Sequence, residues 1–101
     1  MISHEEIIDD IIDRLEESIF PYKIHRNYIY GDFECDVLAT YQNTALCFEV
    51  KTTERDKNVI KARQQLIRIR KHIRGEYPRA FMFECYGLKG VDDFEIREYF
   101  G

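Results

Sequence analysis

Apolar residues at helical spacing open the chain and recur in its second half. The first such stretch follows Ser3, an N-cap residue whose capping-box partner is Glu6, and it ends before Pro21. The second runs from about Asn58 to Arg74. We therefore predict two amphipathic helices. Their apolar positions are Ile7, Ile8, Ile11, Ile12, Leu15 and Ile19 in the first, and Val59, Ala62, Leu66, Ile69 and Ile73 in the second.

Between and after these helices the pattern changes to short runs that favour β-strands. Gln42-Asn43 is a hairpin turn between the second and third of these runs. The order α-β-β-β-α-β-β predicts an α/β fold, in which two helices flank a mixed five-stranded sheet within a single domain over residues 1–101. The predicted strands are residues 22–30, 33–41, 44–52, 80–86 and 94–100.

Charge is distributed unevenly along the chain, whose net charge is −4. Residues 1–50 carry 11 acidic and 3 basic side chains, and residues 80–101 carry 5 acidic and 2 basic ones. Residues 51–79 reverse this balance, with 10 basic and 3 acidic side chains. Such asymmetry predicts a surface that faces a polyanion, with an ordinary solvated helix as the alternative.

The cysteines and the chain termini bear on location. Cys35, Cys47 and Cys85 are odd in number, form no CxxC motif and lie within strand-like runs. This favours buried reduced thiols in an intracellular, cytoplasmic protein. No apolar run approaches the ~20 residues of a membrane helix, and the start MISHEEII has no basic region typical of a signal peptide. We therefore expect no membrane association.

Two opposite charges end the third predicted strand. Because side chains alternate along a strand, Leu46, Phe48 and Val50 point to one face. Glu49 and Lys51 point to the other face, where they are neighbours. The strand is therefore predicted to be buried on one face, with chemically reactive groups at the end of the other.

A third charged residue lies on the preceding strand. In an antiparallel pair that turns at Gln42-Asn43, Asp36 lies almost directly opposite Glu49. Facing carboxylates repel one another, and a divalent cation such as Mg²⁺ is the usual compensation. Lys51 could then orient or deprotonate a water, or neutralise a developing oxyanion. The alternative is a surface Glu–Lys pair, which contributes little.

The segments CDVLA and CFEVKT resemble the motif of the PD-(D/E)xK nuclease superfamily. Within it, most of the chain is similar to archaeal Holliday junction resolvases and small phage-type replication and repair nucleases. The resemblance implies a restriction-endonuclease-like fold and hydrolysis of DNA phosphodiester bonds with Mg²⁺, or Mn²⁺ as a substitute. It makes Asp36 and Glu49 catalytic metal ligands, the Val50 carbonyl a backbone ligand and Lys51 the catalytic lysine. Cys35 stands where the family often has proline.

The family often adds a glutamate from its leading helix. Helical geometry places Glu5 on the same edge as Ile8, so we predict Glu5 as the third metal ligand of the catalytic site. Glu16 and Glu34 are alternatives. A first-turn acid is also favoured by the helix dipole alone.

The second helix presents a row of polar side chains about one turn apart. Such a row can supply non-specific, salt-dependent contacts to phosphates, although ordinary helix surface is the alternative. Related nucleases often carry a glutamine here, and Gln65 is the better candidate because it lies nearer the apolar side. The predicted nucleic-acid-binding residues are Lys57, Lys61, Gln64, Gln65, Arg68 and Lys71.

We therefore expect a metal-dependent DNA endonuclease, acting on branched, Holliday junction-like DNA in repair or recombination. A symmetric homodimer would supply two sites, and the terminal strand, residues 94–100, is a possible interface. The alternative is a catalytically inactive nucleic-acid-binding or regulatory module on the same fold. A protein–protein adaptor, with the basic segment serving only solubility, is a further alternative.

Overall fold

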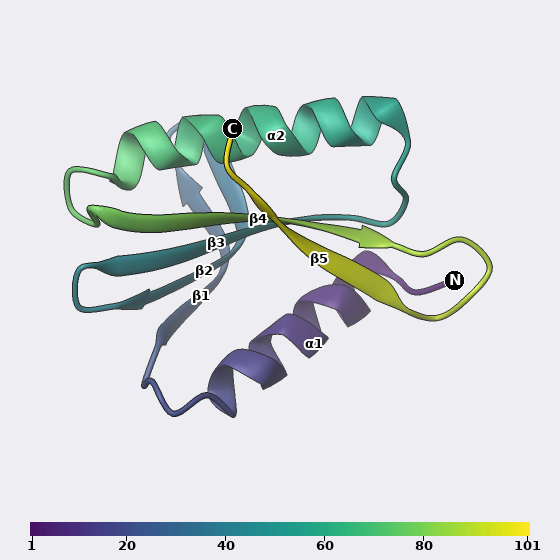
Figure 1. The fold of residues 1–101 in the computed structure, drawn as a ribbon, viewed down its shortest axis with the longest axis horizontal. Helices are drawn as coiled ribbons and strands as arrows, with labels where there is room; N and C mark the ends of the chain where they lie inside the picture. The colour runs from purple at the N-terminus through teal and green to yellow at the C-terminus, as the bar shows by residue number, and fades with distance from the viewer.

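A five-stranded sheet with one helix on each face makes up the fold (Figure 1). The computed structural model describes all 101 residues. Neither helix is long and apolar enough to cross a membrane. In chain order the elements are α1 (His4–Glu16), β1 (Lys23–Tyr30), β2 (Phe33–Tyr41), β3 (Thr44–Lys51), α2 (Asp56–Ile73), β4 (Arg79–Gly87) and β5 (Phe94–Tyr99).

The sheet is mixed, and its spatial order is β1-β2-β3-β4-β5. β3 and β4 pair in parallel and are connected through α2, while every other pair is antiparallel. This confirms the predicted α/β fold with the order α-β-β-β-α-β-β. Because β3 and β4 are parallel, Lys51 and Tyr86 lie side by side at their carboxyl ends.

The start of α1 matches the sequence prediction. The Ser3 hydroxyl accepts the Glu6 N–H at 3.1 Å, and the Glu6 carboxylate accepts the Ser3 N–H at 3.1 Å. This reciprocal capping box satisfies two of the N–H groups that a helix start leaves unpaired.

The end of α1 differs from the prediction. The helix stops at Glu16, and Ile19, predicted to belong to its apolar face, is 92% exposed. The Ser18 hydroxyl accepts the Phe20 N–H at 3.2 Å. Serine can compete with helical hydrogen bonding in this way, so the helix ends well before Pro21.

Two separate apolar cores hold the layers together. Phe48 and Val50 belong to the core under α1, whereas Cys47 belongs to the core under α2, as alternation along β3 predicts. The expectation that only one face of this strand is buried is wrong, because α2 covers the other face up to Glu49.

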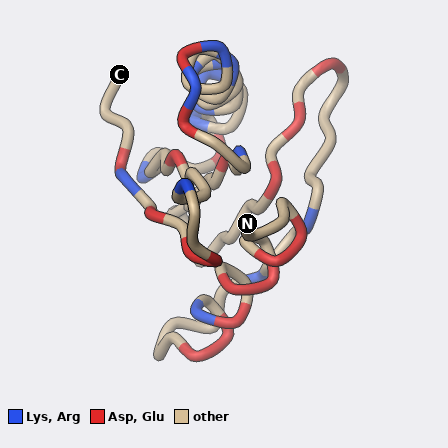
Figure 2. The backbone as a smooth tube through the Cα atoms, turned by 90° about the vertical axis from the view of Figure 1, so that its right-hand side faces the viewer, with Lys and Arg blue, Asp and Glu red and all other residues tan.

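The β1–β2 hairpin bends where it approaches α2. Cys35 belongs to the core under α2 and Val37 to the core under α1, although residues two apart normally share a face. Opposite this irregularity, Asn27 has a φ of +52°, a backbone conformation in which asparagine is enriched. The hairpin then runs beside α2 (Figure 2), where the ring centroids of Tyr30 and His72 lie 3.5 Å apart.

A candidate metal and nucleic-acid site

Two carboxyl groups from neighbouring strands are buried together. Asp36 on β2 is 5% exposed and Glu49 on β3 is 4% exposed. The pKa of Glu49 is raised to about 11, mainly by burial, and further by a hydrogen bond to Asp36 and by the charge of Asp36. The pair therefore favours a proton on Glu49 unless a positive charge joins it.

The position of Asp36 relative to Glu49 differs in detail from the directly opposite pairing predicted for the hairpin. The antiparallel ladder follows the expected register as far as Val37 opposite Phe48. At Asp36 it ends, and the Asp36 Oδ2 accepts the N–H of Val50 at 2.7 Å. Asp36 and Glu49 are thus adjacent, and the hydrogen bond to the β3 backbone fixes the Asp36 side chain.

Lys51 opens onto a polar hollow at the end of β3. The hollow has a volume of about 190 Å³ and no apolar residue in its lining. Its lining joins Lys51 to one side of α2, and the Gln65 Oε1 is buried there without a hydrogen-bond partner. The positive charge of Lys51 also lowers the pKa of Glu49, although less than burial and Asp36 raise it. The hollow is lined by Lys51, Lys61, Gln64, Gln65 and Arg68.

The structure therefore brings together most of the residues predicted on α2. Lys61, Gln64, Gln65 and Arg68 share the hollow with Lys51. Lys57 and Lys71 are exposed on α2 and do not line the hollow.

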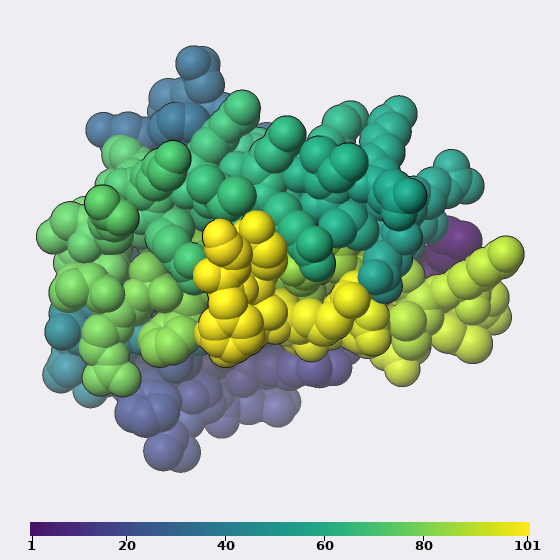
Figure 3. Space-filling model, turned by 45° about the horizontal axis from the view of Figure 1, so that its top comes forward, coloured from purple at the N-terminus to yellow at the C-terminus, as the bar shows by residue number.

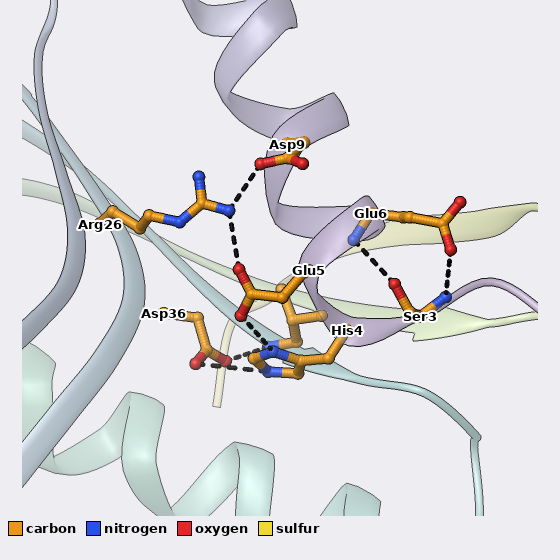
Figure 4. Close-up of polar contacts among 8 residues, drawn as sticks. Ser3, His4, Glu5, Glu6, Asp9, Arg26 and Asp36 are labelled. Carbon is orange, nitrogen blue, oxygen red and sulfur yellow. Dashed lines mark hydrogen bonds and ion pairs between the residues drawn. The ribbon is translucent and has the colours of Figure 1, made fainter.

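Glu5, the predicted third ligand, lies outside this group. Its side chain is 64% exposed, and its carboxylate accepts a hydrogen bond from Arg26 at 2.8 Å (Figure 4). The α1 side chain nearest Asp36 is instead His4, whose Nε2 lies 3.5 Å from the Asp36 Oδ1. The sequence pattern could have indicated this position of His4. Its spacing to Ile8 and Ile11 is that of a single helix face, and both isoleucines are buried.

The alternative acids do not approach the pair either. Glu16 is exposed at the end of α1. Glu34 is exposed and pairs with Ile29 towards the end of the β1–β2 hairpin.

A third buried acid, missed by the sequence analysis, lies beside Glu49. Glu84 on β4 is 2% exposed and stands directly opposite Glu49 in the parallel ladder. The Nε and Nη2 atoms of Arg63 each lie 3.1 Å from a Glu84 carboxylate oxygen. Arg63 therefore neutralises Glu84 and ties α2 to β4. A sequence feature could have revealed Glu84: it is a single glutamate between Phe83 and Cys85 in an otherwise apolar strand.

The residues present fit a hard divalent cation with few protein ligands. No three His, Cys, Asp or Glu side chains are grouped so that they could hold a metal ion. Mg²⁺, however, commonly takes only one or two carboxylates and retains several waters. Asp36 and Glu49 supply that number of hard oxygen ligands, and a cation between them would offset the burial and the charge of Asp36 that raise the pKa of Glu49.

No protein-family model matches this chain, and no curated protein matches its sequence.

Proposed function

We propose that this chain is a metal-dependent nuclease that hydrolyses phosphodiester bonds in DNA. The observation that carries the proposal is the buried Asp36–Glu49 pair, with Lys51 two residues further along β3 on the same face. A structural surface pair would be exposed and would need no burial of two acids. Burial of two adjacent carboxyls costs stability, which is typical of functional sites.

Each residue has a distinct role in this proposal. Asp36 and Glu49, with the carbonyl of Val50, would hold Mg²⁺ or Mn²⁺. The bound cation would supply Lewis-acid polarisation of the phosphate and a lowered pKa for an attacking water. The Lys51 ammonium would lie against the negative charge that grows on the phosphate in the transition state.

The surface of α2 would hold the DNA backbone. Lys61 and Arg68 line the same hollow as Lys51, so a phosphate in that hollow would contact all three cations. Lys57 and Lys71 extend the row along the helix and would bind flanking phosphates. The Gln65 Oε1, buried at the hollow without a partner, could accept a hydrogen bond from a water bound there.

Cleavage of a set of labelled DNA forms tests this proposal. Junction, flap, duplex and single-stranded DNA would be incubated with Mg²⁺ or Mn²⁺ over a salt series. We expect metal-dependent cleavage by the wild type and none by Asp36→Ala. Glu34→Ala is the matched control, because it removes an exposed acid from the same strand and should retain activity. Absence of cleavage of every form with either metal would overturn the proposal.

A second candidate is a DNA-binding module without catalysis. The observation in its favour is that no acid from α1 joins the Asp36–Glu49 pair, since Arg26 holds Glu5 at the surface. This candidate predicts salt-dependent DNA binding without cleavage. It also predicts that Asp36→Ala leaves every measured property of the DNA complex unchanged.

A further inference from the structure

One edge of the sheet is an open strand. β5 is last in the sheet and hydrogen-bonds only to β4 (Figure 3 shows its segment in yellow on the open surface). Proteins commonly protect such edges with proline, a bulge or charged side chains, lysine above all. β5 reads FEIREY: it contains neither proline nor lysine and pairs with β4 without a bulge, and because its charged residues are of both signs they repel a second strand in some registers only. Its outer backbone groups can therefore accept another strand.

The carbonyl groups at the carboxyl end of β5 already accept hydrogen bonds within the chain. Arg70 of α2 donates hydrogen bonds to the carbonyl oxygens of Tyr99 and Phe100 at 3.4 and 3.3 Å. This contact leaves the middle of the strand, from Glu95 to Glu98, as the segment available for pairing.

The middle of β5 is complementary to itself. Ile96 lies on the α1 face, whereas Glu95 and Arg97 lie on the α2 face next to Tyr86 and Glu84. Two copies of β5 that pair antiparallel with Ile96 opposite Ile96 place each Glu95 opposite the Arg97 of the other copy. Opposite charges at directly facing positions stabilise a strand pair.

The neighbouring registers lack this complementarity. Centring the pair on Glu95 places two carboxylates face to face, and centring it on Arg97 does the same with two guanidinium groups. Like charges at facing positions are destabilising. The charge pattern therefore selects the register centred on Ile96.

An apolar trough on the α1 face adjoins the same strand. α1 packs over β1, β2 and β3, so that Phe83 on β4 and Ile96 on β5 stay only partly buried. Both residues line a hollow of about 340 Å³ whose lining is mostly apolar. A second strand beside β5 would cover Ile96 and narrow this trough.

We propose that the protein forms a two-fold symmetric dimer through antiparallel pairing of β5 with β5 of a second copy, centred on Ile96. The symmetry axis is perpendicular to the joined sheet, so both α2 helices lie on the same side. The two Asp36–Glu49 sites would then face one DNA molecule together. The dimer itself is independent of the proposed nuclease activity, because its argument uses only the strand edge.

Charge exchange across the interface tests this dimer. Analytical ultracentrifugation should give twice the monomer mass for the wild type. Arg97→Glu and Glu95→Arg should each weaken dimerisation about tenfold or more, because each puts two like-charge pairs into the interface. The double variant Glu95→Arg/Arg97→Glu should dimerise within about threefold of the wild type, because the reciprocal pairs are restored.

Two controls separate this interface from other effects. Within the chain Arg97 contacts Glu54 at 2.6 Å and Glu95 at 3.3 Å; Glu54→Gln removes the first of these contacts and should leave dimerisation unchanged. Lys23→Glu reverses a charge on β1, the other edge of the sheet, and should also have no effect. A monomeric wild type, or a double variant as defective as its single variants, would overturn the proposal whatever the outcome of the cleavage assay.

Discussion

The two faces of the sheet differ in the side chains that they bury. Under α1 the core is built from apolar side chains and Cys85, and the one buried acid in contact with this helix is Asp36, which lies 3.5 Å from His4 at the start of α1. The core under α2 is also apolar along most of its length, but charged residues replace it at the carboxyl ends of β3 and β4. Glu49 and Glu84 are buried in that region, with Asp36 of β2 beside Glu49, although a buried acid costs stability unless it is paired. The α1 face thus stabilises the fold, and the α2 face supports a site.

The outer surfaces of the helices differ in the same sense. α1 exposes mainly acidic side chains and α2 mainly basic ones, on opposite sides of the sheet (Figure 2). A polyanion would therefore be repelled from α1 and drawn to α2, the side on which Lys51 opens. The basic surface and the candidate site residue Lys51 therefore lie on the same face of the sheet, the one covered by α2.

The largest expected effect concerns Lys51. We expect Lys51→Met to reduce the rate of DNA cleavage at saturating DNA about 10³-fold, in addition to any loss of affinity. Lys61→Met, from the same hollow, should instead weaken binding and leave the rate at saturating DNA nearly unchanged. Single-turnover kinetics with binding measured in Ca²⁺ would separate the two. Equal effects of both variants on the rate would remove the distinction between a catalytic and a binding lysine.

The next effect compares an ion pair whose carboxylate is buried with one that is exposed. Arg63→Met leaves Glu84 buried without its partner, so the melting temperature should fall by several degrees. Adding Glu84→Met should restore much of the loss. On the other side of the sheet, Arg14→Met breaks an exposed pair with Asp10 and should change little. Similar melting temperatures for Arg63→Met and Arg14→Met would contradict the proposed asymmetry.

A third effect depends on pH. The pKa of Glu49 is raised to about 11 in the folded protein, so between about pH 4.5 and 11 folding takes up a proton. Without added metal, this group therefore lowers stability as pH rises, by at most about 1.4 kcal/mol per pH unit. Glu49→Gln should remove that loss and stabilise the metal-free protein most at alkaline pH. Urea unfolding at pH 6 and 9 checks this, and a stability gain independent of pH would contradict it.

The smallest effect concerns the salt dependence of DNA binding. Lys71→Ser should reduce the slope of log affinity against log salt by about 0.9, as loss of one phosphate contact does. Glu16→Ser, which removes an acid from α1, should leave the slope unchanged. Binding isotherms at several salt concentrations test both variants. Equal slopes for wild type and Lys71→Ser would place the DNA elsewhere.

Local patterns predicted much of the fold because they depend on neighbouring residues. The capping box of Ser3 and Glu6 fixed the start of α1, and the turn at Gln42-Asn43 fixed the register of β2 and β3. The end of α1 was wrong because apolar spacing extends to Ile19, whereas Ser18 favours a turn. Periodicity does not include this competition between side chain and backbone.

The candidate site was only partly predictable, since it depends on how separate elements pack. Alternation on β3 identified Glu49 and Lys51, and the hairpin added Asp36. Helical geometry gives the direction of Glu5 relative to its own axis but not the position of α1 over the sheet, so the proximity of His4 to Asp36 did not emerge. The Arg63–Glu84 pair requires the parallel register of β4 with β3, which no local pattern specifies.

Binding of Mn²⁺ most directly tests the central claim that Asp36 and Glu49 share one cation. Titration followed by electron paramagnetic resonance, with calorimetry in buffers of different ionisation enthalpy, would measure stoichiometry and proton release at pH 7. We predict one ion per chain, release of about one proton from Glu49, and loss of binding in both Asp36→Asn and Glu49→Gln but not in Glu34→Gln. No bound Mn²⁺, or binding that survives both substitutions, would contradict the account.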